Sequence, residues 1–187
     1  MAWINRPTRG LDKAVAPIVA PNNLHNLEAM IRQRAAEVLD SLPRIETFDW
    51  VEKVSIELTT MMLATLFVFP WKDKHLLTYW SDISITDINA PGALVTSDEE
   101  RLGVQRKMRR YFATLWEERS KGEPGFDLVS MMVHDEATKN LSTGDLISTF
   151  VQLIVGGDDT TPNAMTGSLW RCATIRSNSP PCGLIIA

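Results

Sequence analysis

The residues of this sequence that could do chemistry gather in one stretch near its end, from Gly156 to Thr161. Two glycines, Gly156 and Gly157, interrupt an apolar helical segment, and two carboxylates and two hydroxyls follow them directly. Glycine costs about 1 kcal/mol relative to alanine inside a helix, so the pair indicates that something approaches the backbone closely. Buried carboxylates are expensive unless they are hydrogen-bonded or functional. The stretch therefore predicts either a functional site or, equally well, a turn in which the Asp and Thr residues act as caps.

The composition is that of an ordinary globular chain, either one domain or part of a larger one. Of its 187 residues, 44% are hydrophobic and 22% are charged, and the net charge is −4. Because the charge is acidic and no basic tract occurs, we expect no nucleic-acid partner. The longest strongly apolar run, 61–70, is too short to span a membrane. No leader pattern opens the chain, so the expected location is the cytoplasm.

Helical periodicity recurs along the chain, and no alternating run of β-branched residues competes with it. The sequence therefore predicts an all-α fold. The expected helices cover 23–42, 49–67, 73–85, 97–121 and 127–136, followed by a helix from 142 that carries the glycine pair. Capping patterns mark several starts, such as Ser97 with Glu100 and Ser142 with Asp145.

Apolar positions predict how deeply these helices are buried. The helix 49–67 is nearly apolar all round, which places it in the middle of a large fold. Along 97–121 the apolar residues expected to face inward are Leu102, Met108, Phe112, Leu115 and Trp116. The Arg and Lys residues between them are expected to form a solvated face rather than a binding patch.

The order Gly-Gly-Asp-Asp-Thr-Thr over 156–161 resembles the oxygen-binding segment of the long central helix in cytochrome P450 monooxygenases, written Gly-Gly-x-acid-Thr-Thr. The resemblance extends from about 14 to 169 and includes the helices 49–67 and 127–136. It implies that the chain is the central portion of the mainly helical P450 fold and ends in the oxygen-binding central helix.

The resemblance also implies roles for most of the stretch. Gly156, Gly157 and Thr161 would bind the haem cofactor, because the glycines let the helix pass directly over the haem face. The hydroxyl of Thr160 would hold dioxygen and its protons in place, and the carboxylate of Asp159 would relay protons from solvent. Asp159 and Thr160 are thus the predicted catalytic residues. General acid–base assistance of this kind is typically worth about 10²–10⁴-fold.

Two short segments, 55–60 and 165–167, are similar to bacterial alkane and fatty-acid terminal hydroxylases. They imply a haem-thiolate monooxygenase that inserts one atom of O2 into a C–H bond of an apolar, chain-like substrate. Ferredoxin and a ferredoxin reductase would bring the electrons from NAD(P)H. The apolar residues that could line the substrate channel are Leu76, Trp80, Ile83 and Ile88. For any one of them, packing in the core is the favoured interpretation.

Two features depart from the family pattern. The family's axial cysteine, in a Phe-x-x-Gly loop far downstream, has no counterpart here, and Cys182 lacks the neighbours of that loop. No metal ligand is therefore predicted, and the chain alone is expected to be an inactive fragment; the alternative is a non-catalytic, truncated helical protein. Pro162 removes a helical donor where the helix should continue, at about 3 kcal/mol in a helix interior. Asp158 occupies the family's variable position and receives no role.

The two ends of the chain, 1–13 and 170–187, are hypothesised to be translations in a shifted reading frame. Residues 170–176 show no helical periodicity where the family helix should run on. For 169–176 and for 1–11, codons exist that encode family-like sequence in another frame. The chain would then be a single partial P450 domain, 1–187, in which 14–169 is family-like. Helix faces left uncovered by the absent part predict poor solubility.

Overall fold

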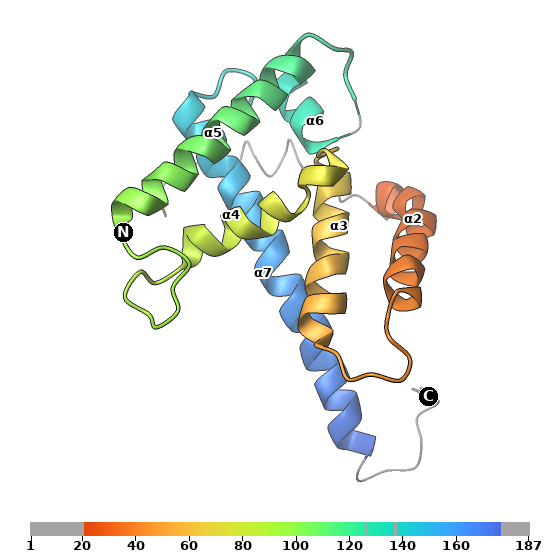
Figure 1. The fold of residues 1–187 in the computed structure, drawn as a ribbon. Helices are drawn as coiled ribbons and strands as arrows, with labels where there is room; N and C mark the ends of the chain where they lie inside the picture. Colours follow the sequence, from red (N-terminus) through yellow and green to blue (C-terminus); the bar gives the residue numbers. More distant parts are fainter. Residues whose placement is uncertain (1–20, 126, 137, 177–187) are drawn as a thin grey trace.

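A computed structural model describes residues 21–125, 127–136 and 138–176 of the chain, and all regular structure in these ranges is helical (Figure 1). The elements are α2 (Pro21–Asp40), the π-helix η1 (Val51–Ile56), α3 (Glu57–Leu66), the 3-10 helix η2 (Trp71–Asp73), α4 (His75–Ile85), α5 (Asp98–Ser120), α6 (Leu128–His134) and α7 (Thr143–Arg176). The all-α prediction is confirmed. In the part of the chain that the structure describes, no helix is long and apolar enough to cross a membrane. Segments 1–20 and 177–187, with Cys182, lie outside the described residues.

Helix α7 is the axis of the molecule (Figure 1). α3 and α4 pack against it, α5 and α6 pack together over its first half, and α2 lies against α3. At 34 residues α7 is the longest of the described helices, and it packs against η1, α3, α4 and α5. A side chain on α7 therefore lies either against one of these elements or on the side that they leave open.

Side-chain caps start the helices where the sequence predicts. The Ser97 hydroxyl accepts from the Glu100 amide at 3.2 Å, and the Glu100 carboxylate accepts from the Thr96 amide at 2.8 Å. The Ser142 hydroxyl likewise accepts from the Asp145 amide at 3.2 Å at the start of α7. These bonds satisfy amide groups that the first turn of a helix leaves without an intrahelical partner.

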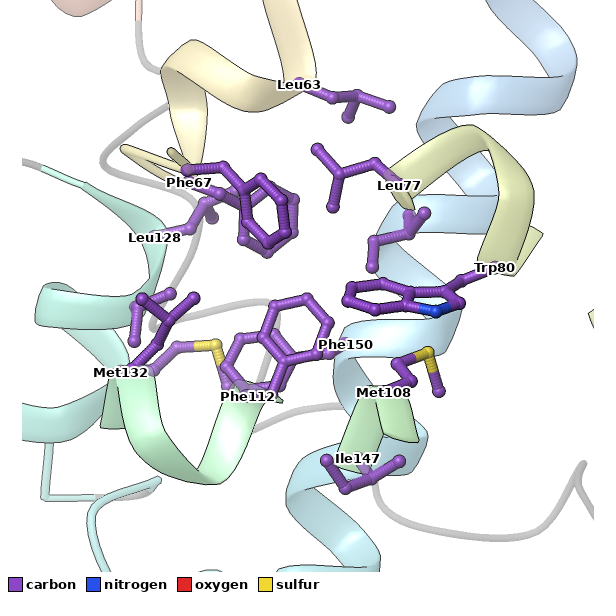
Figure 2. Close-up of a cluster of buried hydrophobic side chains, with 14 of the residues drawn as sticks. Leu63, Phe67, Leu77, Trp80, Met108, Phe112, Leu128, Met132, Ile147 and Phe150 are labelled. Carbon is purple, nitrogen blue, oxygen red and sulfur yellow. The ribbon is translucent and has the colours of Figure 1, made fainter. Parts of the chain in front are cut away.

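An aromatic core joins α3, α4, α5 and α7 (Figure 2). Phe112 and Phe150 stack with ring centroids 4.5 Å apart. The ring centroid of Phe67 lies 6.1 Å from that of Phe112 and 6.0 Å from that of Phe150. All three side chains are fully buried. Burying rings of this size gives a large share of the hydrophobic stabilisation, and it anchors the first half of α7.

Two helical predictions need correction. The expected helix 49–67 begins with π-helical turns in η1 and continues as α3, which periodicity cannot distinguish. Leu102, expected to face inward, is 52% exposed. The apolar core along α5 begins only at Val104, so the first turn of α5 lies beyond the aromatic cluster.

Candidate functional site

Helix α7 carries every predicted site residue, and it runs without interruption past Gly156, Gly157 and Pro162 to Arg176. The predicted interruption at the glycines is wrong, and residues 170–176 are helical although their sequence shows no helical periodicity. Pro162 lacks an amide hydrogen but does not end the helix. Residues 171–175 are exposed, so their lack of apolar periodicity matches a helix with no buried face.

Asp159 and Thr160 are consecutive residues of α7, and both are exposed. The Thr160 hydroxyl donates to the Gly156 carbonyl at 2.8 Å. The Asn163 amide lies 3.4 Å from the Asp159 carboxylate. Thr161, also exposed, follows on the same helical turn. We call Gly156, Asp159, Thr160 and Asn163 the open face; it presents a carboxylate and a hydroxyl that can exchange protons with solvent or a ligand.

The two glycines differ in what surrounds them. A Cβ atom on Gly157 would lie 2.8 Å from Cδ2 of Leu63, so α3 makes the close approach that this glycine permits. A Cβ atom on Gly156 would meet nothing within 4 Å. The close approach to the backbone that was predicted for both glycines is therefore made by different partners. Gly157 makes room for a neighbouring helix, and of the two only Gly156 leaves the backbone open to a ligand.

Asp158 points the opposite way, into the contact between α7, α4 and α3. Its side chain is 7% exposed and accepts a hydrogen bond from the Thr78 hydroxyl at 3.2 Å. The Thr78 hydroxyl is in turn 2.7 Å from that of Thr60, which is fully buried. The sequence prediction gave Asp158 no role, although a signal was available. Phe150, Ile154 and Pro162 are buried at four-residue steps, and Asp158 falls in the same register.

Burial makes Asp158 a perturbed acid. Removal from water raises its pKa to about 6, and the like charges of Asp82 and Asp159 add to the rise, while the hydrogen bond from Thr78 opposes it. Partial burial also raises the pKa of Asp82, with a contribution from Asp159. Three carboxylates therefore act on one another where α4 crosses α7.

The residues proposed for a substrate channel lie mostly in the core. Trp80 is 4% exposed and makes an edge contact with Phe69 at 6.0 Å, and Ile83 is fully buried. Leu76 packs against the same aromatic cluster. Ile88 is half-buried in the loop after α4. Core packing, the interpretation favoured from sequence, is what the structure shows for Leu76, Trp80 and Ile83.

A second apolar feature lies at the other end of α7. A groove of about 520 Å³ runs between α2, the η1–α3 segment and the second half of α7. Its lining is almost entirely apolar and includes Leu39, Trp50, Met165 and Leu169. Cys172 also lines it as a free thiol. Among the described residues, no three His, Cys, Asp or Glu side chains group so that they could hold a metal ion.

Known proteins resemble this chain over most of its length. A cytochrome P450-153 from Novosphingobium aromaticivorans is 43% identical, with a TM-score of 0.78 over 93% of this chain and 41% of that one. CYP153D17 from Sphingomonas sp. PAMC 26605 is 37% identical, with a TM-score of 0.79 over 93% and 43%. Cytochrome P450 FAS1 from Rhodococcoides fascians is 30% identical over 149 residues, 77% of this chain and 35% of the relative. No family model matches the chain.

The comparisons also show how much of each relative's length this chain covers. The chain spans only about two fifths of the length of the proteins it matches, between 35% and 43%. The helices described above are therefore the counterpart of one portion of those proteins. The open face of α7 lies within the matched part of the chain.

Proposed function

The chain belongs to the cytochrome P450 family, as a part of its fold, and we propose that it forms the oxygen-binding portion of a haem-thiolate monooxygenase. The reaction is insertion of one atom of O2 into a C–H bond of an alkane or fatty acid, at the terminal carbon. The likeness of 55–60 and 165–167 to terminal hydroxylases supports the substrate class. This chain by itself is a fragment that we expect to be inactive.

The open face of α7 is the observation that carries this proposal. Asp159 and Thr160 are exposed side by side, and the Thr160 hydroxyl is held by the Gly156 carbonyl at 2.8 Å. A hydroxyl that donates to a carbonyl keeps its oxygen lone pairs free to accept a hydrogen bond from a proton donor. An exposed carboxylate beside it can supply that proton from solvent. The pair can thus hold and move protons at the Thr160 oxygen, which reductive cleavage of dioxygen requires.

The residues present fit one side of a haem. Gly156 is exposed, and the space where its side chain would be is empty to 4 Å, so a flat macrocycle can approach the backbone there. Gly156 and Thr161 would contact the cofactor, while the Cβ side of Gly157 is occupied by Leu63, so that Gly157 could contact the cofactor only from another side of its backbone. Haem, when bound, supplies the oxidising chemistry, and the protein orients the substrate and controls protons. The thiolate ligand would come from a part of the protein beyond the described residues.

The same proposal includes a source of electrons and a cellular location for the complete enzyme. Ferredoxin and a ferredoxin reductase would deliver electrons from NAD(P)H. The complete enzyme would work in the cytoplasm. An apolar chain would be bound by burial, at about 0.8 kcal/mol per methylene, so that the shape of the pocket selects the carbon attacked.

A chimaera tests the proposal. Residues 21–169 replace the matching segment of the Novosphingobium aromaticivorans P450-153, and the product is purified with haem. We expect an absorption band of thiolate-ligated haem after reduction and CO binding, and a hydroxylated product from medium-chain alkanes or fatty acids in the presence of ferredoxin and reductase. A chimaera that binds haem but never oxidises such chains would contradict the proposed substrate class.

The same spectrum distinguishes the proposed monooxygenase from the alternative, a non-catalytic helical protein that keeps the helices without the chemistry. The unmodified 187-residue chain is mixed with haem, reduced and exposed to CO. A thiolate band from this chain would show that it ligates haem and would contradict its assignment as a fragment. If neither the chain nor the chimaera gives a band, the helices do not support the haem site, and the non-catalytic alternative is favoured.

A further inference from the structure

The contact between α4 and α7 contains a chain of three polar side chains that the proposed chemistry does not use. Asp158 of α7, Thr78 of α4 and Thr60 of α3 are joined by bonds of 3.2 Å and 2.7 Å. Asp158 and Thr60 are buried, and Gly157 packs on Leu63 one position away. Three helices therefore meet at one polar chain inside an otherwise apolar contact.

Which hydroxyl donates in each of these two hydrogen bonds depends on whether Asp158 carries a proton. A hydroxyl has one hydrogen to donate, so when Thr78 donates to an ionised Asp158, Thr60 must donate to Thr78. A protonated Asp158 can instead donate to Thr78, which then donates to Thr60. Both hydrogen bonds form in either arrangement, but only the first arrangement leaves a charge buried between the helices.

We propose that Asp158 is a positioning residue that holds α4 against α7 through Thr78, tightly when Asp158 is protonated and loosely when it is ionised. Asp158 touches no ligand in this proposal and acts through Thr78. The proposal does not require haem, so it can fail or succeed independently of the proposed function.

The charged groups around Asp158 favour this behaviour. From α4, Asp82 lies one helical turn beyond Thr78, and from α7, Asp159 is the adjacent residue; both repel an ionised Asp158. α3 offers Thr60 and Leu63 at this contact, neither of them ionisable. The ionisable residues at the near ends of α3 and α4 pair with each other: Glu57 bonds Lys74 at 2.6 Å and lies 3.8 Å from His75. Tyr79 of α4 is 41% exposed and is the other titratable group on that helix.

The direction of the pH effect follows from the pKa of Asp158. Its value is about 6 in the folded chain, above the ordinary 3.8, so the native state binds more protons than the opened state between these limits. Stability of the contact is therefore full below about pH 4 and is lost as the pH rises through about 6.

Amide hydrogen exchange of the full 187-residue chain tests the proposal. Peptides covering α4 are followed between pH 5 and pH 7, with rates corrected for intrinsic exchange. In the wild-type chain, we expect the protection of α4 to fall by about tenfold over this range, since opening exposes a carboxyl whose pKa drops from about 6 to 3.8. In Asp158→Asn, which keeps the shape without the charge, we expect protection to change by less than about twofold.

Two further variants complete the design. Asp40→Asn neutralises an exposed carboxylate at the end of α2 and should keep the wild-type pH dependence. Thr78→Val removes the hydroxyl, whereas Thr78→Ser retains it, so Val should lower α4 protection and Ser should not. Equal pH dependence in the wild type and Asp158→Asn would overturn the proposal. If Asp158→Asn does not fold, equal protection in the two Thr78 variants at both pH values would overturn it.

Discussion

The two faces of α7 around the glycine pair have nearly the same sequence chemistry and opposite surroundings. On one face, Gly157 and Asp158 are pressed against α3 and α4, with Asp158 only 7% exposed. On the other, Gly156 and Asp159 are open, and nothing lies within 4 Å of where the Gly156 side chain would be. One glycine and one aspartate stand on each face, so residue type does not distinguish them.

What distinguishes the faces is the neighbour that each residue meets. Asp158 has a hydroxyl donor and two like charges nearby, which makes it a perturbed buried acid. Asp159 has solvent on its outer side, which suits a group that exchanges protons. The difference shows that polar residues in one run can have different surroundings: the packed face, from Phe150 through Asp158, contacts neighbouring helices, and the open face carries the residues proposed for the chemistry.

The largest expected effect is on stability at the packed face. Replacing Phe150, which is fully buried and stacks on Phe112, with alanine should lower the free energy of unfolding by about 3–5 kcal/mol. Urea unfolding of the full chain measures it. Trp170→Ala is the matched control: the ring is 73% exposed, so its loss should change stability by less than about 0.5 kcal/mol. Similar losses for both aromatics would erase the contrast between the packed and open parts of α7.

The next effect is on activity at the open face. Thr160→Ala in the haem-bound chimaera should lower hydroxylation by about 10²-fold, because the hydroxyl that holds the proton is gone, and Thr160→Ser should restore most of it. Product per electron consumed is the measurement. Ser168→Ala removes another hydroxyl that donates to a carbonyl four residues back, at 2.7 Å, and should leave product formation unchanged. A comparable loss from Ser168→Ala would show that the helix, and not the Thr160 oxygen, is responsible.

The glycines allow the most direct comparison of the two faces. Gly156→Ala and Gly157→Ala gain the same helix propensity, but only the Cβ at 157 would press on Leu63, at 2.8 Å. Overpacking of this kind costs about 1–3 kcal/mol, so the Gly156→Ala chain should be the more stable by about that amount. Thermal or urea unfolding of the two variants decides the point. Equal stabilities would mean that Leu63 moves aside at little cost.

The smallest effect concerns a hydroxyl pair between η1 and α7. The Ser55 hydroxyl is fully buried and lies 2.9 Å from that of Thr166. Ser55→Ala should destabilise the chain by about 1 kcal/mol, the usual net value of one such bond. The unfolding midpoint in urea measures the loss. An unchanged midpoint would place this contact, like the open face, outside the part of α7 that stabilises the fold.

Local signals made the helix starts predictable. The Ser97–Glu100 and Ser142–Asp145 patterns form the bonds expected of them, because a cap involves residues only three apart in the sequence. The motif at 156–161 placed Asp159 and Thr160 together for the same reason, since helical geometry alone puts adjacent residues on one turn. Helix class and candidate residues could thus be predicted from short-range spacing.

Predictions that depended on distant neighbours were less successful. Leu102 looks like an inward-facing residue by spacing, but no part of the aromatic core reaches the first turn of α5. The glycine pair was expected to interrupt α7 and to make room for a ligand, yet α7 is continuous and Gly157 accommodates Leu63 of α3. In each case the deciding atom belongs to an element far away in the sequence.

The sequence by itself determined that the chain is helical, where most helices start, and which six residues form the glycine motif. Only the tertiary structure decided which of the two aspartates is buried, which of the two glycines is in contact, and that Thr78 and Thr60 complete a polar chain with Asp158. The physical reason is that propensity and capping act within a few residues, whereas burial is set by the helices that pack across α7.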